Sequence, residues 1–191
     1  MKTMTEIIDF FNQRAASWDT TVPVNADRIR YLISLLSLSS GDRVLDVGCG
    51  TGVLEDFLPR DIRLTAMDFS PEMIRVAKAK HPDANYVAGD FLEVGGEALY
   101  DKIIMYNVFP HFIERERAIK KAHQLLGPHG MLLICHGAGR SVINTRHSGL
   151  KGNISRSLPT AGEFKTLLNP LFNMVLAEDR EEYFAIKGIK N

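Results

Sequence analysis

The stretch RVLDVGCGTG, residues 43–52, constrains the fold of this chain more than any other feature of its sequence. A short β-prone run ends at Val47, and three glycines follow at alternate positions, Gly48, Gly50 and Gly52. Glycine after a strand supplies a positive φ and lets a ligand approach the backbone without a Cβ in the way. A strand that leads directly into such a loop is typical of α/β proteins, which bind ligands beyond the carboxyl ends of their strands.

Short β-branched runs alternate with helical patterns along the rest of the chain. Strands are expected over residues 43–47, 63–68, 84–89, 101–107, 130–136, 172–179 and 181–189, and helices over 22–38, 70–80, 114–127 and 160–168, with a helix opening over 53–60. This alternation predicts an α/β fold with a mainly parallel sheet and helices on both faces. The last two strands are joined by a short turn, so the final strand is expected to run antiparallel.

The composition favours one soluble domain. The chain has 191 residues, 45% of them hydrophobic, and its formal net charge is zero, so it lacks the basic excess typical of nucleic-acid binders. The N-terminal MKTMTEIIDFFNQR does not resemble a signal peptide, and no run approaches the length of a membrane span, so a cytoplasmic protein is expected. For Cys49 and Cys135, each in an apolar stretch, buried free thiols are favoured over a disulfide or a reactive pair.

The spacing of the glycines argues against a bound diphosphate. The dinucleotide fingerprint is G-x-G-x-x-G, whereas this loop reads G-x-G-x-G and has Val53 at the final position. Asp46 lies two residues before the first glycine, where a carboxylate would repel a pyrophosphate and attract an ammonium group. The loop therefore favours a zwitterionic or cationic ligand.

Further acidic and apolar residues follow the next two strands. Asp68 lies 20 residues after Gly48, the position from which an acid accepts hydrogen bonds from a ribose diol. Phe69 and Met73 are placed to pack against an adenine face, and Asp90 to accept a hydrogen bond from its exocyclic amine. This set suits an adenosine that has a positively charged amino-acid tail and no phosphates.

Five segments stand in the order and spacing of a known family: VLDVGCGTG, MDFSPEMI, GDF, YDKIIMYNVFPHF and LLGPHGMLLI. Over roughly residues 5 to 190 the chain resembles the class I S-adenosylmethionine-dependent methyltransferases. The resemblance implies a Rossmann-like, seven-stranded sheet with an antiparallel last strand. We expect a single domain over 1–191, made of an N-terminal helical cap (1–40), a cofactor-binding core (41–137), an acceptor-side insertion (138–158) and a closing helix and strand pair (159–191).

The resemblance also implies residues that bind S-adenosylmethionine, or S-adenosylhomocysteine as the product. Those implied for the methionine portion and the sulfonium end are Asp46, Gly48, Cys49, Gly50 and Asn107. Those implied for the ribose and the adenine are Asp68, Phe69, Met73, Asp90 and Phe91. Residues 10–22 resemble the N-terminal segment that small-molecule members fold over the cofactor. Within it, Trp18 is either a core anchor or part of a lid, and Arg14 is either solvated or in contact with the cofactor carboxylate.

The methyl acceptor is less constrained. His111 follows the fourth strand. If the segment after the fifth strand is helical, His136, Arg140, Asn144 and His147 share one face of it, although Gly137 and Gly139 argue against a helix at its start. We take His111, His136 and Arg140 as candidate acceptor-side catalytic residues, with Arg140 facing an anionic group. A solvent-facing loop and a weak His/His metal site remain as alternatives, and no metal is expected.

The short chain leaves no room for a separate substrate domain, so a small-molecule acceptor is expected. An Asn-Pro-Pro-Tyr signature of amino-group methylation is replaced by NVFP at 107–110. We expect a methyltransferase, monomeric or homodimeric, with no nucleic-acid or membrane partner. The alternatives are a non-catalytic cofactor-binding sensor or partner module, and a nicotinamide-dependent oxidoreductase, which the glycine spacing and Asp46 disfavour.

Overall fold

A computed structural model of the protein describes residues 4–148 and 155–191. Its centre is one seven-stranded sheet with the strand order β3-β2-β1-β4-β5-β7-β6. The strands are β1 (Arg43–Val47), β2 (Arg63–Asp68), β3 (Asn85–Ala88), β4 (Tyr100–Tyr106), β5 (Leu126–His136), β6 (Phe172–Asp179) and β7 (Phe184–Lys190). The expected bounds of β1, β2 and β6 are confirmed to the residue.

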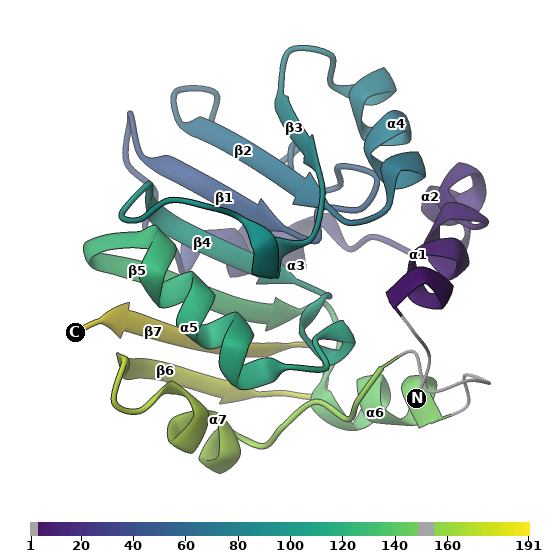
Figure 1. Cartoon of the computed structure of the whole chain (residues 1–191). Coiled ribbons are helices and arrows are strands. Elements are labelled where there is room, and N and C mark those ends of the chain that lie inside the picture. The colour runs from purple at the N-terminus through teal and green to yellow at the C-terminus, as the bar shows by residue number, and fades with distance from the viewer. Residues whose placement is uncertain (1–3, 149–154) are drawn as a thin grey trace.

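The sheet is parallel except at one strand. The pairs β1–β2, β1–β4, β2–β3 and β4–β5 are parallel, whereas β7 pairs antiparallel with both β5 and β6. The arrow of β7 accordingly points the opposite way to its neighbours in Figure 1. The expected antiparallel last strand is thus confirmed.

Helices cover both faces of the sheet, as expected. The helices are α1 (Met4–Asn12), α2 (Trp18–Thr21), α3 (Ala26–Ser34), α4 (Pro71–Lys80), α5 (Arg115–Leu125), α6 (Arg140–Ser148) and α7 (Ala161–Leu168). Buried residues of α5 and α7 pack with those of β1, β4 and β5 on one face, and α3 packs against the opposite face. The segments α1, α2 and α6 lie beside the edge where the parallel strands end (Figure 1).

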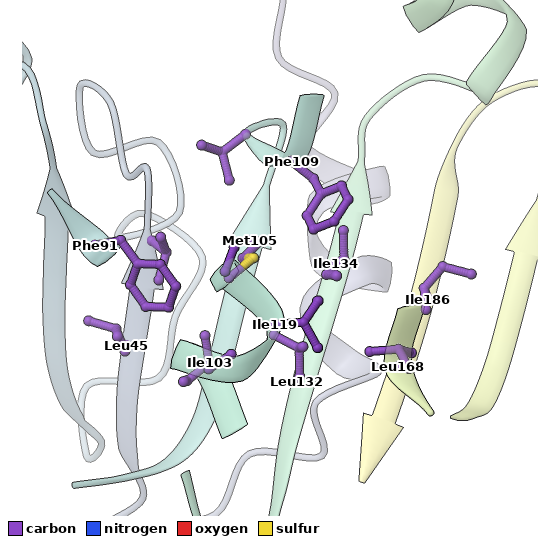
Figure 2. Packing of buried hydrophobic residues seen from close by; sticks show 14 of the residues in the cluster. Leu45, Phe91, Ile103, Met105, Phe109, Ile119, Leu132, Ile134, Leu168 and Ile186 are labelled. Carbon is purple, nitrogen blue, oxygen red and sulfur yellow. The ribbon is translucent and has the colours of Figure 1, made fainter. Parts of the chain in front are cut away.

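The largest core cluster lies between the sheet and α5. Figure 2 shows Ile119 of α5 lying over Ile103 of β4 and Leu132 of β5. All three side chains are at most 1% exposed. Burying an aliphatic side chain of this size stabilises a fold by about 1.5–3 kcal/mol, so this layer holds the strand ends that carry the polar residues in a fixed register.

Two helix starts follow from local sequence. The side chain of Ser70 accepts a hydrogen bond from the backbone N–H of Met73, and Pro71 is the first residue of α4. At α7, Thr160 and Glu163 form the expected capping box. Caps of this kind each contribute about 1 kcal/mol, and they fix where the helices begin.

The prediction that a helix opens over residues 53–60 is wrong. Residues 51–58 form turns, with isolated hydrogen bonds from the N–H groups of Phe57 and Leu58 to the carbonyl of Leu54. Pro59 follows and biases the residue before it away from the helical conformation. Residues 53–58 before it form bends and turns in place of a helix. The glycine loop is therefore followed by turns, without the free N–H groups of a helix N-terminus.

The helix expected over 22–38 is shorter in the structure. It begins after Asn25, whose side chain accepts a hydrogen bond from the N–H of Arg28, and it ends at Ser34. Ser37 has a positive φ of 51°, which a continuing helix excludes. The residues before Asn25 are thereby released to line the cavity described below.

Two further expectations concern the cysteines and membrane-spanning helices. Cys49 and Cys135 are both buried and free, as predicted. Among residues 4–148 and 155–191, no helix is both long and apolar enough to cross a bilayer.

Candidate functional site

Two adjoining cavities lie at the carboxyl ends of the strands. The first, of about 450 Å³, lies between the N-terminal segment and the ends of β1, β4 and β5, and the second, of about 230 Å³, lies beside β1 and β2. They share the lining residues Gly48, Asp68, Phe69, Val108 and His111.

The structure brings nearly all the predicted site residues to these cavities. Those lining the first are Asp46, Gly48, Cys49, Gly50, Asp68, Phe69, Met73, Asn107, His111 and His136. Asp90 and Phe91 line the second. Arg140 lines neither cavity.

Gly48 and Gly50 are required for different reasons. Gly48 has φ +75°, and a Cβ added there would overlap the side chain of Val108, with the Val108 Cβ only 2.7 Å away. Gly50 has φ +57°, and an added Cβ would meet no atom within 4 Å. Gly48 therefore permits close packing of β1 against the segment after β4, whereas Gly50 leaves open space beside the backbone.

Asp46 lies between two apolar residues of the neighbouring strands. Its neighbours in register are Ala66 and Ile104, and its side chain is 1% exposed. Neither of its carboxylate oxygens makes a hydrogen bond within the described part of the chain. Burial raises the pKa of Asp46 well above its ordinary value, and the charges of Glu55 and Asp68 raise it further. A carboxylate held this way requires a cationic hydrogen-bond donor to become favourable.

Asp68 is also buried, at 8% exposure, but its two oxygens have partners. They accept hydrogen bonds from the N–H of Gly50 at 3.0 Å and of Ser70 at 2.8 Å. Burial raises the pKa of Asp68 to about 6, against the lowering effect of these two bonds. Each carboxylate oxygen keeps further acceptor capacity, and Asp68 borders both cavities, so it is placed to accept two hydroxyl groups.

The second cavity is mostly apolar. Phe91 is buried in the main core, where its ring packs 5.8 Å from that of Phe112. The side chain of Asp90 accepts a hydrogen bond from the N–H of Leu92 at 2.9 Å and caps the short turn over 91–93. The lining is thus mostly apolar and includes three acidic residues, Asp68, Asp90 and Glu114, which suits a flat heteroaromatic ring with an amino group.

The N-terminal segment is fastened over the first cavity. The ring of Phe11 contacts the rings of Trp18, Phe69 and His111 at centroid distances of 5.6, 5.5 and 5.1 Å. Asp19 forms an ion pair with Lys80 at 2.9 Å and a short hydrogen bond with Thr51 of the glycine loop. Trp18 both packs against this aromatic cluster and lines the cavity, so the two interpretations of Trp18 are compatible.

The four polar residues from the end of β5 onward do not all lie on one helix, because the segment that contains Gly137 and Gly139 is not helical. His136 is the last residue of β5 and is 2% exposed. Residues 137–139 are not helical, and α6 begins at Arg140. Arg140 forms an ion pair with Asp179 at 2.9 Å, away from the cavities. Asn144 is bonded to the backbone of Leu158. The side chain of His147 lies outside the described residues.

The end of β4 is held in a special conformation. Asn107 has a positive φ of 55°, and its side-chain oxygen accepts a hydrogen bond from the N–H of Gly137 at 3.0 Å. Left-handed backbone costs an L-residue roughly 1–2 kcal/mol, and tertiary contacts must maintain it here. The hydrogen bond between Asn107 and Gly137 joins the ends of β4 and β5, and both residues line the first cavity.

Several lining residues are absent from the predicted set, including Arg28, Thr51, Tyr106 and Arg146. Thr51 and Tyr106 adjoin predicted residues, so proximity to the motifs was a usable signal. Arg28 and Arg146 lie on helices, and only the packing of α3 and α6 brings them to the cavity. Within residues 4–148 and 155–191, no group of three or more His, Cys, Asp or Glu residues is arranged to hold a metal ion.

Comparisons with known proteins agree with this architecture. Residues 44–130 match the family model of the methyltransferase domain. A malonyl-[acyl-carrier protein] O-methyltransferase of Priestia megaterium is 34% identical over 131 residues, covering 64% of this chain and 48% of the relative. The chain thus spans about half the length of the malonyl-[acyl-carrier protein] O-methyltransferases it matches.

Solved structures show the same fold. A chain from the Haloferax volcanii complex of the Trm112 methyltransferase activator with a methyltransferase has a TM-score of 0.80 at 17% identity, covering 94% of this chain and 97% of that one. The N-methyltransferase NodS of Bradyrhizobium japonicum, in complex with S-adenosylhomocysteine, has a TM-score of 0.68 at 21% identity, covering 86% of both chains. By matching sequence over residues 44–130 and by fold, the chain is similar to the class I S-adenosylmethionine-dependent methyltransferases.

Proposed function

We propose that the protein binds S-adenosylmethionine and transfers its methyl group to a small-molecule acceptor. The observation that carries this proposal is the buried Asp46 carboxylate, which lines the cavity and has no hydrogen-bond partner in the described chain. A diphosphate ligand would add repulsion at this point, whereas the ammonium group of a methionine tail supplies the missing donor.

The remaining residues fit the other parts of the cofactor. Asp46, the Gly48–Gly50 loop and Asn107 would hold the methionine portion, Asp68 the ribose hydroxyls, and the second cavity, beside Asp90 and Phe91, the adenine. Phe69 and Met73 would support the adenosine from the side of α4.

S-adenosylmethionine held by these residues would supply an electrophilic methyl group for in-line transfer to a lone pair of the acceptor, with S-adenosylhomocysteine as the leaving group. The protein's contribution is to hold the acceptor close and aligned, which contributes several kcal/mol to such reactions. His111 and His136 border the same cavity and are placed to take a proton from an acceptor that must lose one.

The test is calorimetric titration with S-adenosylhomocysteine, with NAD as the comparison ligand. We expect micromolar binding of S-adenosylhomocysteine at one site and no binding of NAD. Asp68→Ala should weaken binding by about 1–3 kcal/mol because two ribose hydroxyls would lose their acceptor. Asp61→Ala, an exposed acid in the loop before β2, is the matched control and should leave the affinity unchanged.

Two results would contradict the proposal. Binding of NAD but not of S-adenosylhomocysteine would favour an oxidoreductase. Tight cofactor binding without release of S-adenosylhomocysteine in a broad acceptor screen would favour a sensor or partner module.

A further inference from the structure

The first cavity has opposite charges at its two ends. Asp46 and Asp68, with the glycine loop, form one end, here called the carboxylate end. Arg28 and Arg146 line the part formed by α3, α6 and the ends of β4 and β5, here called the arginine end. Because β4 lies between β1 and β5 in the sheet, β5, which ends one residue before the carbonyl that holds Arg28, lies about 10 Å from β1.

Arg28 is fixed at the cavity by one of its five donors. Its Nη1 donates to the carbonyl of Gly137 at 2.6 Å, and the N–H of Gly137 donates to the side chain of Asn107. These bonds connect α3 to the ends of β5 and β4. Among the described residues, the other guanidinium N–H groups of Arg28 have no hydrogen-bond partner, so they remain available to a ligand.

The neighbouring charges do not neutralise Arg28. On α3, Asp27 pairs with Arg30 instead, and Asp19 across the cavity pairs with Lys80. No ion pair joins Arg28 or Arg146 to a carboxylate within residues 4–148 and 155–191. The positive charge of Arg28 also reaches Tyr106, whose pKa burial raises to about 12 while Arg28 opposes that rise.

We propose that the arginine end is an anion site, with Arg28 as its main residue, and that it selects acceptors bearing a carboxylate or phosphate group. This inference rests on the proposed function. The sulfonium of bound S-adenosylmethionine and the unpaired guanidinium of Arg28 would both be positive charges at the same cavity. A cationic acceptor between them would be repelled by both. An anionic group is attracted to both, and the planar guanidinium matches carboxylate and phosphate geometry. Arg140, the residue expected from the sequence to do this, is engaged by Asp179.

The test measures binding of small aromatic probes to the protein saturated with S-adenosylhomocysteine. The probes are benzoate, phenyl phosphate and the uncharged benzamide, and affinities are measured by NMR titration. We expect an anionic probe to bind about 10- to 100-fold more tightly than benzamide, the range for hydrogen bonds to a charged group. A preference for benzoate over phenyl phosphate, or the reverse, identifies the anion class.

Substitutions test whether Arg28 causes the preference for anionic probes over benzamide. Arg28→Gln should abolish it, Arg28→Lys should retain part of it, and Arg146→Gln should reduce it. Arg30→Gln is the matched control, because Arg30 lies on the same helix, pairs with Asp27 and does not line the cavity. Affinity for S-adenosylhomocysteine should change by no more than about threefold in any of these variants. If Arg28→Gln does not fold, Arg28→Lys and Arg146→Gln still test the site.

Three outcomes would overturn the inference. The first is equal affinity for benzamide and the anions, or no probe binding at millimolar concentration. The second is retention of the full preference in the Arg28 and Arg146 variants. The third is a loss of S-adenosylhomocysteine affinity in Arg28→Gln as large as the loss of anion binding, which would assign Arg28 to the cofactor's own carboxylate. Absence of S-adenosylhomocysteine binding in the unsubstituted protein would instead contradict the proposed function, and the probes can then be titrated against the unliganded protein.

Discussion

The carboxylate end and the arginine end of the first cavity are built in different ways. At the carboxylate end, Asp46 and Asp68 are buried residues of β1 and β2, and the register of the parallel sheet fixes their positions. At the arginine end, Arg28 and Arg146 lie on helices, and their side chains are only partly buried or exposed. The negative charges are therefore held by the sheet, and the positive charges by helix packing.

This difference separates what each end can do. Buried carboxylates with raised pKa values cost folding free energy, and a ligand with a cation and hydroxyl groups recovers that cost on binding. Partly exposed arginines cost little when unliganded and can accommodate different anions. We therefore expect substitutions at the carboxylate end to change stability and cofactor affinity, and those at the arginine end to change acceptor preference.

The largest effect is expected from alanine at Gly48. The added Cβ overlaps Val108 and the backbone keeps a positive φ, so Gly48→Ala should lower the free energy of unfolding by about 3 kcal/mol or more. Gly50→Ala, which meets no atom within 4 Å, should lower it by about 1 kcal/mol from its positive φ alone. Urea unfolding of both variants measures the difference. Equal losses would show that the two glycines do not have separate roles.

The next effect is expected from removal of the Asp46 charge. Asp46→Asn should weaken S-adenosylhomocysteine binding about 10- to 100-fold, because a charge-assisted bond to the ammonium group is lost. Since burial raises the pKa of Asp46, the same substitution should increase the free energy of unfolding of the unliganded protein at pH 8. Calorimetry and urea unfolding test the two parts. A parallel loss of affinity and stability would indicate that Asp46 serves the fold.

A pH dependence is expected from Asp68, whose pKa is raised to about 6. Ribose hydroxyls donate to the ionised carboxylate, so S-adenosylhomocysteine affinity should fall about tenfold per pH unit below pH 6. The unliganded protein should show the opposite trend. Its folded state holds this proton more tightly than the unfolded chain, with its ordinary pKa of 3.8, so the stabilisation is complete below that value and is lost as the pH rises through about 6.

Titrations between pH 5 and pH 8 measure both trends, with Asp68→Asn as the control that should remove this contribution. A pH-independent affinity in the unsubstituted protein would show that the cofactor does not use the Asp68 carboxylate.

The smallest effect is expected at the N-terminal segment. Asp19→Ala removes a partly exposed ion pair with Lys80 and the bond to Thr51, and should cost about 0.5–1 kcal/mol of stability. Hydrogen exchange of α1 and α2 should increase, while exchange in α5 should stay unchanged. Uniformly faster exchange would show that this contact supports the whole fold.

Local sequence was sufficient for most of the fold. The strand β1, the start of α4 at Ser70 and the capping box at Thr160 each depend on a few consecutive residues, and the structure confirms all three. The helix expected over 53–60 shows the limit of prediction from local sequence, because Pro59 disfavours the helical conformation at the residue before it and the segment forms turns.

The carboxylate end was determined by the sequence itself. In a parallel sheet, the carboxyl ends of the strands meet at one edge, so Asp46, Gly48 and Asp68 converge once the strands are correctly placed. The arginine end was decided only by the tertiary structure. Helix packing depends on contacts between distant residues, and such contacts bring Arg28 to Gly137, 109 positions later, and engage Arg140 with Asp179. Sequence spacing carries no information about pairs of this kind.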